Sequence, residues 1–188
     1  LYKEKGSKFI AYAFPVFSEE DVKKRLEEIR KKEYAARHHC YAYTLHPDKS
    51  AWRANDDGEP ANTAGNPILG QIESKDLTNT LIVVVRYFGG VKLGVGGLIK
   101  AYRAAAIDAL EDITIEKRFV KEMYEVCFQY PQMNEVMRIV KDKSLEVVDQ
   151  DFQIDCKLTF AIRKSQADIV VANFKKNHEL TIKYQKTI

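Results

Sequence analysis

The chain has 188 residues, of which 45% are hydrophobic and 30% are charged, and its formal net charge is +3. This composition is typical of a globular protein and excludes a disordered polar tail. The small net charge excludes a generally basic nucleic-acid binder, so binding of that kind would require local clustering of cations.

Cysteine content and hydropathy bear on the compartment. Three widely spaced cysteines without a C-x-x-C pair favour reduced thiols and a cytoplasmic location. Uninterrupted apolar segments are far shorter than the about 18 residues that span a bilayer, so we expect no membrane segment. The sequence begins with Leu1 rather than Met, and we therefore expect a few residues before it.

The first 45 residues predict a strand, a helix and a second strand. Aromatic and β-favouring residues predict a strand over 9–17, and Ser18 then occupies the position of a helix N-cap. Apolar residues follow at helical spacing, with charged residues between them. Residues 39–45 alternate between two faces, which predicts a half-buried strand.

A long irregular segment separates this region from the next buried strand. Residues 46–67 contain three prolines, two glycines and the only tryptophan, and they predict a functional or disordered loop. A central strand is expected over 79–88. A glycine-rich turn follows it, and then an alanine-rich helix from Leu98 to about Asp112, which we expect to be covered on both flanks.

The pattern of elements restarts near Thr114. Strands are expected at 119–130, 145–152, 154–163 and 179–186, with helices at 131–143 and 165–176. The order β-α-β-β-α-β is that of the ferredoxin-like fold. The sequence therefore predicts two α+β domains.

Glycines are concentrated after the predicted central strand, where five of the nine lie within nine residues: Gly89, Gly90, Gly94, Gly96 and Gly97. A turn of this kind before a helix exposes backbone N–H groups beside the positive helix end, which suits an anion such as phosphate. Residues 77–107 contain no Asp or Glu but four cations: Arg86, Lys92, Lys100 and Arg103. The alternative is that the glycines only form a tight turn and let the helix pack closely.

The glycine turn does not match two strict nucleotide-binding motifs. A Walker A motif would require Lys and then Ser or Thr where Val95 and Gly96 stand. A dinucleotide-binding fingerprint would require glycine in place of Ile99. We therefore expect no nucleotide cofactor, although looser anion binding stays open.

An acidic segment lies within the predicted loop. Asp56, Asp57 and Glu59 could bind a cation or act in acid–base chemistry. The favoured interpretation is that they shape a turn, since Asp, Gly and Pro are common turn residues. A third interpretation is that Thr63 and its neighbouring backbone contact a ligand directly.

The remaining candidates are the histidine and cysteine residues near position 40 and the aromatic residues at the end of the predicted central strand. His39 and Cys40 point to opposite faces of a strand, and no second cysteine lies at a zinc-ligand spacing, so we expect a buried structural Cys40 and no metal site. Tyr87 is a candidate for stacking on bases, whereas Phe88 is expected to lie in the core.

Several uncommon sequence blocks occur in order along the first 102 residues. They are Ala36-Arg37-His38-His39-Cys40-Tyr41-Ala42-Tyr43, Asp57-Gly58-Glu59-Pro60, Thr63-Ala64-Gly65, Pro67-Ile68-Leu69, Arg86-Tyr87-Phe88-Gly89-Gly90, Leu93-Gly94, Gly96-Gly97-Leu98 and Ala101-Tyr102. In this combination the chain closely resembles the IMPACT family, in particular its bacterial YigZ-like branch. One departure is Ala61-Asn62, where the family usually has Ser-Gly. Asn tolerates a left-handed backbone, so the turn should persist, but a catalytic hydroxyl at position 61 is not expected.

The resemblance implies an α+β protein with two domains, an IMPACT-type domain over 1–113 and a ferredoxin-like domain over 114–188. The first should resemble a small-subunit ribosomal protein, the fourth domain of elongation factor G and small-molecule kinases of the homoserine and mevalonate type, as a βα sandwich. The second should resemble the fifth domain of that elongation factor. This pair implies RNA or the ribosome as partner. Eukaryotic relatives regulate translation through protein partners but carry a different attached domain.

The leading hypothesis is a cytoplasmic, non-enzymatic RNA- or ribosome-associated protein, with a role in translation regulation and no cofactor. It binds phosphates in a basic, glycine-rich groove formed by Arg86, Tyr87, Gly89, Gly90, Lys92, Gly94, Gly96, Gly97, Lys100 and Arg103. Four further residues are candidates for lining the groove: His38, Asp57, Glu59 and Thr63. No catalytic residue and no metal ligand is assigned.

Two other functions stay open. The first is an enzyme for a small phosphorylated metabolite or nucleotide, with the glycine turn as cradle and Asp57 or Glu59 holding a metal or acting as base. The second is a protein-interaction adaptor that uses the ferredoxin-like domain. The sequence does not identify an RNA target, a protein partner or an oligomeric state.

Overall fold

The computed structural model describes residues 1–111, 113–153 and 155–188 and divides into two compact units, Leu1–Ile115 and Glu116–Ile188. Each unit has its own sheet and its own hydrophobic core. The expected two-domain α+β architecture is thereby confirmed. The predicted helix end at Asp112 and the predicted strand start at Ile154 lie outside the described residues.

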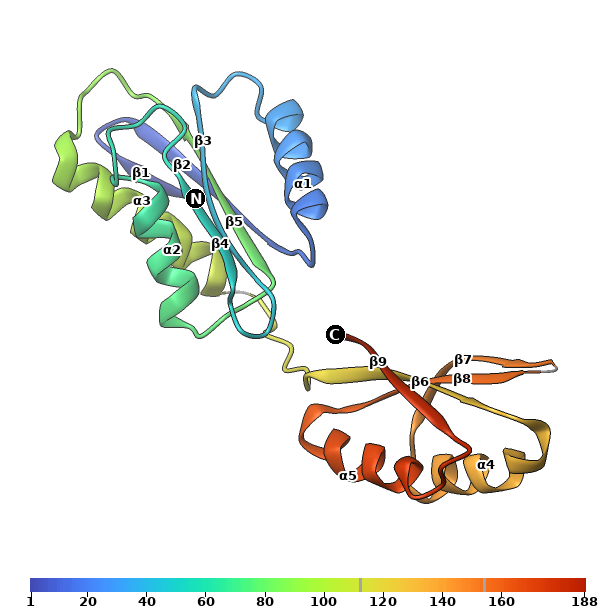
Figure 1. The fold of residues 1–188 in the computed structure, drawn as a ribbon. Coiled ribbons are helices and arrows are strands. Elements are labelled where there is room, and N and C mark those ends of the chain that lie inside the picture. The colour runs from blue at the N-terminus through green and yellow to red at the C-terminus, as the bar shows by residue number, and fades with distance from the viewer. Residues whose placement is uncertain (112, 154) are drawn as a thin grey trace. The chain divides into compact units, whose positions relative to one another are not determined.

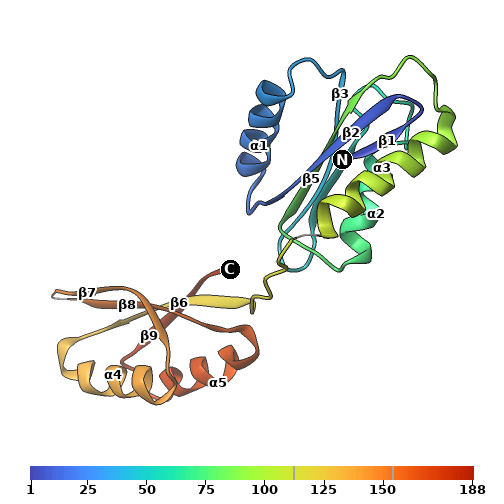
Figure 2. The same ribbon diagram turned by 180° about the vertical axis from the view of Figure 1, so that it is seen from behind.

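The first unit is built on a five-stranded antiparallel sheet in the order β1-β2-β5-β3-β4. Its strands are β1 (Tyr2–Glu4), β2 (Ser7–Pro15), β3 (His38–Leu45), β4 (Ala51–Asn55) and β5 (Thr80–Tyr87). Its helices are α1 (Glu19–Lys32), α2 (Gly65–Ser74) and α3 (Gly94–Glu111). Helix α1 covers one face of the sheet, and α2 and α3 cover the other (Figures 1 and 2).

Strand β5 shows why the sheet has helices on both sides. Leu81, Val83 and Val85 pack in the cluster that includes residues of α1, whereas Ile82 and Val84 pack with residues of α2 and α3. An apolar residue at every position requires a covered surface on both faces. Strand β3 is likewise buried on both faces, so the expectation of a half-buried strand was wrong. The expected alternation of its residues between the two faces is correct.

The start of α1 is as the sequence predicts. Ser18 has extended backbone angles, and its side-chain oxygen accepts the N–H of Asp21 at 3.1 Å. Three acidic residues in the first turn and three basic residues in the last turn complement the helix dipole. Local sequence signals are therefore sufficient to place this helix.

Three expectations for the first unit differ from the structure. The segment 46–67 is not one loop, because it holds β4 and the start of α2. Helix α3 begins at Gly94 instead of Leu98, so Gly94, Gly96 and Gly97 belong to its first turn. That helix also has an exposed side, which carries Lys100, Arg103 and Asp108, whereas burial on both flanks was expected.

The second unit has the ferredoxin-like order that the sequence predicts. Strands β6 (Lys121–Phe128), β7 (Glu146–Phe152), β8 (Cys156–Arg163) and β9 (Thr181–Thr187) form an antiparallel sheet in the order β7-β8-β6-β9. Helices α4 (Met133–Asp142), preceded by a 3-10 turn at Tyr130–Gln132, and α5 (Lys164–Lys175) cover one face (Figure 1). Phe160 and Phe174 stack in the core between the sheet and α5, with ring centres 5.3 Å apart.

Candidate functional site

Most of the predicted site residues lie at one end of the first sheet, where β5 ends and α3 begins, and Lys100 and Arg103 follow further along α3. Residues 88–97, here called the glycine loop, leave this end of the sheet, as does the connection from α1 to β3 (Figure 1). Residues 56–63, here called the acidic loop, join β4 to α2 and reach the same end, since Asp57 contacts both histidines at the start of β3. The structure thus brings together two segments that the sequence marks separately.

Close packing explains one glycine of the glycine loop and leaves another unexplained. A Cβ added to Gly89 would lie 1.9 Å from the carbonyl carbon of Gly6 and 2.2 Å from the nitrogen of Ser7, so only glycine fits there. Gly90 and Gly94 have φ values of +88° and +73°, which favour glycine. At Gly96, by contrast, no heavy atom lies within 4 Å of an added Cβ. Folding does not require a bare backbone at Gly96, whereas close approach of an external group would benefit from one.

Asp56 holds the acidic loop against α2. One carboxylate oxygen accepts the backbone N–H groups of Ala64 and Gly65 at 2.9 and 2.8 Å, and the other accepts that of Asn62 at 2.9 Å. Ala64 precedes the helix and cannot cap it with its own side chain. The carboxylate therefore replaces the missing N-cap from eight residues upstream.

Asp57 joins the acidic loop to the start of β3. Its carboxylate accepts the backbone N–H of His39 at 2.7 Å, and its carbonyl oxygen lies 2.8 Å from Nδ1 of His38. Arg30 of α1 lies 3.5 Å from the other carboxylate oxygen. His39 is buried, with Nε2 3.2 Å from the carbonyl oxygen of Glu33. These contacts give Asp57 a scaffolding position beside the half-buried His38.

Glu59 and Arg86 form a buried ion pair beneath the glycine loop. Their side chains are 4% and 7% exposed, and Nη1 of Arg86 lies 2.6 Å from Oε1 of Glu59. The hydroxyl of Tyr102 on α3 donates to the same oxygen at 2.8 Å. The guanidinium carbon also lies 5.6 Å from the ring centre of Phe9 and 5.5 Å from that of Phe88. Arg86 is therefore an internal cation, and the expectation that it faces a ligand has to be revised.

Cys40 lies in the same buried network and is held as a neutral thiol. It is fully buried, with Sγ 3.0 Å from the carbonyl oxygen of Asp56 and 3.3 Å from the hydroxyl of Tyr102. Burial raises the pKa of the Cys40 thiol far above its ordinary value, and burial likewise raises the pKa of the Tyr102 phenol. A thiol in this environment is not a nucleophile at neutral pH. The expectation of a structural Cys40 is confirmed.

The remaining cations of the expected site are on the surface. Gly96, Lys100 and Arg103 lie four and three residues apart on α3 and so share one side of that helix, here called the cation face. Lys92 is exposed in the glycine loop, and Lys100 and Arg103 are exposed on the helix. Among the residues that the structure describes, none of these three cations takes part in an ion pair.

The other expected residues divide between interior and surface. Thr63 is buried and donates its hydroxyl hydrogen bond to the carbonyl oxygen of Pro60 at 2.7 Å, so it does not line an open groove. Tyr87 is half-buried and donates to the Glu33 carboxylate at 2.7 Å. Phe88 is 51% exposed, so its expected place in the core was wrong, because β5 ends at Tyr87 and the chain then leaves the sheet.

Two members of the network were not singled out as site residues from the sequence. Ser7 accepts the backbone N–H of Gly89 at 3.2 Å across 82 residues of chain, and no local pattern signals such a contact. Tyr102 had a signal, because it follows the glycines as part of the Ala101-Tyr102 block. Its hydroxyl position, shared between Glu59 and Cys40, depends on the tertiary fold.

The geometry favours an anion-binding surface over an acid–base or metal centre. Each carboxylate of the acidic loop accepts internal hydrogen bonds, whereas three cations of the glycine loop and α3 face solvent. Within the described part of the chain, no group of three or more His, Cys, Asp or Glu side chains is arranged to hold a metal ion. The described helices also include none that is both long and apolar enough to cross a membrane.

The fold and the two loops define a class of two-domain α+β proteins in which a glycine loop follows the central strand of an antiparallel sheet. The family described as the Impact N-terminal domain matches residues 5–110. The Escherichia coli "IMPACT family member YigZ" is 34% identical over 160 residues, covering 84% of this chain and 78% of that protein. The chain belongs to the IMPACT family and is YigZ-like.

Two further relatives show the extent of the similarity. The Bacillus subtilis "IMPACT family member YvyE" is 35% identical over 130 residues, which are 69% of this chain and 60% of that protein. A solved structure titled "Crystal structure of an hypothetical protein" matches with a TM-score of 0.73 and 30% identity, covering 98% of this chain and 92% of the other. The latter match extends the similarity to both units.

Proposed function

We propose that this protein binds RNA phosphates through the glycine loop and the cation face, as a cytoplasmic, non-enzymatic protein associated with RNA or the ribosome. The observation that supports the proposal is the sorting of charge between the acidic loop and the surface formed by the glycine loop and α3. Carboxylates are directed inward and hydrogen-bonded, whereas Lys92, Lys100 and Arg103 are exposed. A surface of this kind attracts a polyanion even when the net charge of the whole chain is small.

The backbone contributes to the proposed site beside the cations. Helix α3 begins at Gly94, and its first backbone N–H groups have no partner within the helix, as at any helix start. With the helix dipole, these groups favour a phosphate oxygen. The open surroundings of Gly96 would allow a phosphate to approach without meeting a side chain at that position. Lys100 and Arg103 follow on the same side of the helix.

A non-enzymatic role is supported by the state of the reactive groups. An enzyme would use the carboxylates of Asp57 and Glu59, but both already accept hydrogen bonds. That of Asp57 accepts a backbone N–H, and that of Glu59 accepts from the side chains of Arg86 and Tyr102. The only thiol of the network is buried and protonated. The association with translation rests on the family resemblance, and we propose it for this chain on that basis.

The test is fluorescence-anisotropy binding of labelled single-stranded RNA over a salt series. The variant Lys100→Gln/Arg103→Gln should bind more weakly and lower the slope of log K against log salt by about 1.4, because each lost phosphate contact removes about 0.7 for a single strand. The matched control is Lys23→Gln/Lys24→Gln, two exposed lysines of α1, which packs on the opposite face of the sheet.

The two variants separate a local site from general charge. An unchanged slope in Lys100→Gln/Arg103→Gln, or an equal loss in both variants, would contradict the assignment to the cation face. Absence of binding by the wild-type protein at low salt would contradict the proposed function itself, because electrostatic attraction is strongest there.

A further inference from the structure

A second surface adjoins the glycine loop on the α1 side of the sheet. It is an open groove, here called the stacking groove, lined by Gly6, Lys8, Ile10, Glu33, Tyr87 and Phe88. Lys8 and Tyr87 are direct partners in the pairing of β2 with β5, so their side chains lie on the same face. Glu33, the C-cap residue of α1, and Phe88, the first residue of the glycine loop, complete the lining.

One aromatic ring of this groove is unusually exposed. Phe88 is 51% exposed, whereas Tyr87 is half-buried. The ring of Phe88 also has a fixed inner neighbour, because the guanidinium of Arg86 lies 5.5 Å from its centre and is itself held by Glu59. An exposed ring supported from within by a buried ion pair is a preorganised surface for stacking.

The cations at and near the groove outnumber the one carboxylate in its lining. The one carboxylate in the lining, that of Glu33, accepts hydrogen bonds from the hydroxyls of Tyr12 and Tyr87. These hydrogen bonds lower the pKa of Glu33 and also fix the position of Tyr87. The surrounding charges are cations: Lys8 in the lining, Lys5 in the adjoining turn, and Lys32 with its ammonium 4.6 Å from the ring centre of Tyr12.

We propose that the stacking groove binds an unpaired nucleotide, with its base on the exposed ring of Phe88 and its phosphate at Lys8. Aromatic side chains beside a row of cations are the combination that binds single-stranded nucleic acid, whose base faces are free to stack. In a duplex those faces are covered by neighbouring bases. Phe88 is also the first residue of the glycine loop, so the groove and the proposed phosphate site share that loop. The inference rests on the proposed function and adds that the bound RNA is single-stranded.

The experiment compares a fluorescein-labelled 12-nucleotide oligouridylate with a 12-base-pair RNA duplex, measured by anisotropy at one low salt concentration. Phe88→Leu, which keeps an apolar side chain but removes the flat ring, should weaken binding of the single strand by about five- to tenfold and leave duplex binding unchanged. Ultraviolet crosslinking of the oligouridylate, followed by peptide mass spectrometry, should identify the peptide that contains Tyr87 and Phe88.

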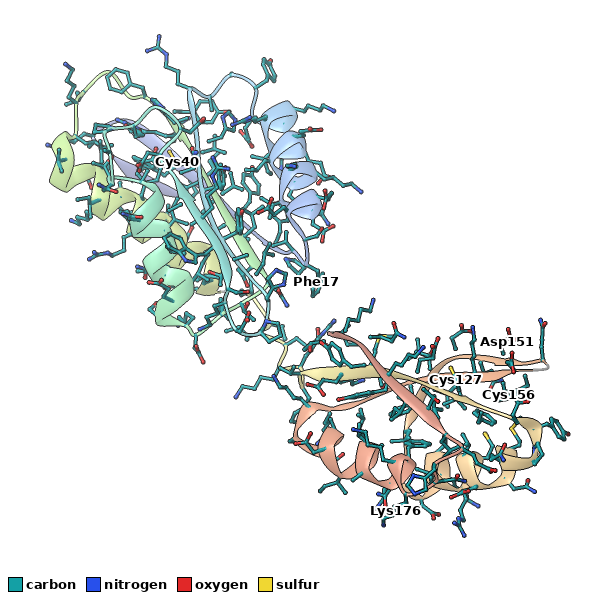
Figure 3. The ribbon with its side chains drawn as sticks, in the orientation of Figure 1. Phe17, Cys40, Cys127, Asp151, Cys156 and Lys176 are labelled. Carbon is teal, nitrogen blue, oxygen red and sulfur yellow. The ribbon has the colours of Figure 1, made fainter. Side chains whose placement is uncertain are left out.

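Phe17→Leu is the matched control. Phe17 is 54% exposed. It lies two residues after Pro15, which pairs with Thr80 at the far end of β5. Figure 3 labels it at the opposite end of the sheet from Cys40, which lies in the buried network beneath the glycine loop. Both variants replace a half-exposed phenylalanine in the same way, so their melting temperatures provide a check on folding.

The outcomes distinguish the inference from the function on which it rests. If the wild-type protein binds the single strand and Phe88→Leu behaves like Phe17→Leu, the stacking groove is overturned while phosphate binding at the cation face stands. Crosslinks confined to other peptides would have the same meaning. If the wild-type protein binds neither RNA, the proposed function fails first.

Discussion

The acidic loop and the glycine loop occupy similar places in the fold but have opposite uses in the structure. Both contain glycine and connect a strand of the same sheet to a helix. The acidic loop directs its charges inward, where Asp56 and Glu59 hold α2, α3 and β5 together. The glycine loop and the helix that it begins present Lys92, Lys100 and Arg103 to solvent. The comparison shows that charge in a loop indicates function only when the partners of that charge are known.

The largest expected effect on stability comes from removing the buried cation Arg86. Arg86→Met leaves the Glu59 carboxylate buried without its partner, and we expect unfolding free energy to fall by about 3–5 kcal/mol. The double variant Arg86→Met/Glu59→Met should recover most of this loss, since it removes both buried charges. Urea unfolding of the full chain, followed by circular dichroism, measures both. A loss below about 1 kcal/mol in the single variant would show that the pair is not a scaffold.

Two glycines of one loop should respond in opposite ways to the same substitution. Gly89→Ala places a methyl group against the backbone of Gly6 and Ser7, so we expect a destabilisation of about 3 kcal/mol. Gly96→Ala meets no atom and replaces a helical glycine, so stability should rise by about 0.5–1 kcal/mol while RNA affinity falls. Thermal unfolding and anisotropy on the same two proteins provide the measurement. Equal RNA affinity for Gly96→Ala and wild type would remove the functional reason for that glycine.

Removing the remote cap tests the acidic loop without changing a buried ion pair. Asp56→Ala deletes the acceptor for three backbone N–H groups at the start of α2 and should cost about 1–2 kcal/mol. Asp56→Asn keeps one acceptor oxygen and should cost less. RNA affinity, measured where both variants are folded, should equal that of the wild type. A selective loss of RNA binding would instead place Asp56 in the ligand site.

The smallest expected effect concerns pH. Hydrogen bonds from Tyr12 and Tyr87 lower the pKa of Glu33 below its ordinary value of 4.5. A carboxylate whose pKa is lowered by folding stabilises the folded state above its unfolded pKa, and that contribution is lost as pH falls through the folded pKa. The unfolding free energy of the wild type, measured by urea unfolding, should therefore exceed that of Glu33→Gln by about 1 kcal/mol at pH 6. This difference should shrink below pH 4.5. A difference independent of pH would argue against a charged Glu33.

The elements that the sequence predicts correctly are those with local signals. Ser18 caps α1 through its own side chain, the apolar run of β5 requires burial on both faces, and the order of elements in the second unit defines the ferredoxin-like sheet. Helix α2 was missed because its cap comes from Asp56, eight residues away, and because Pro67 and two glycines mask its helical pattern. The start of α3 was misplaced for a related reason, since glycine lowers helix propensity and tertiary packing of Leu98 and Tyr102 overrides it.

For the candidate site, the sequence nominates candidate residues but does not show which way their side chains face. It places Arg86, Lys92, Lys100 and Arg103 in one acid-free stretch, and nothing in that stretch distinguishes the buried cation from the exposed ones. The distinction comes from Glu59, 27 residues upstream, which the fold brings within 2.6 Å of Arg86. Phe88 lies at the surface because β5 ends one residue before it.

The proposed RNA site is tested most directly by finding which backbone amides respond to RNA. In an NMR titration of ¹⁵N-labelled protein with a 12-nucleotide oligouridylate, we expect chemical-shift changes for the amides of Gly94, Gly96 and Lys100. The amide signals of Ala64 and Gly65, which Asp56 already holds, should not change and serve as internal controls. Changes centred on the acidic loop, with the glycine loop and the cation face unchanged, would contradict RNA binding at the glycine loop and the cation face.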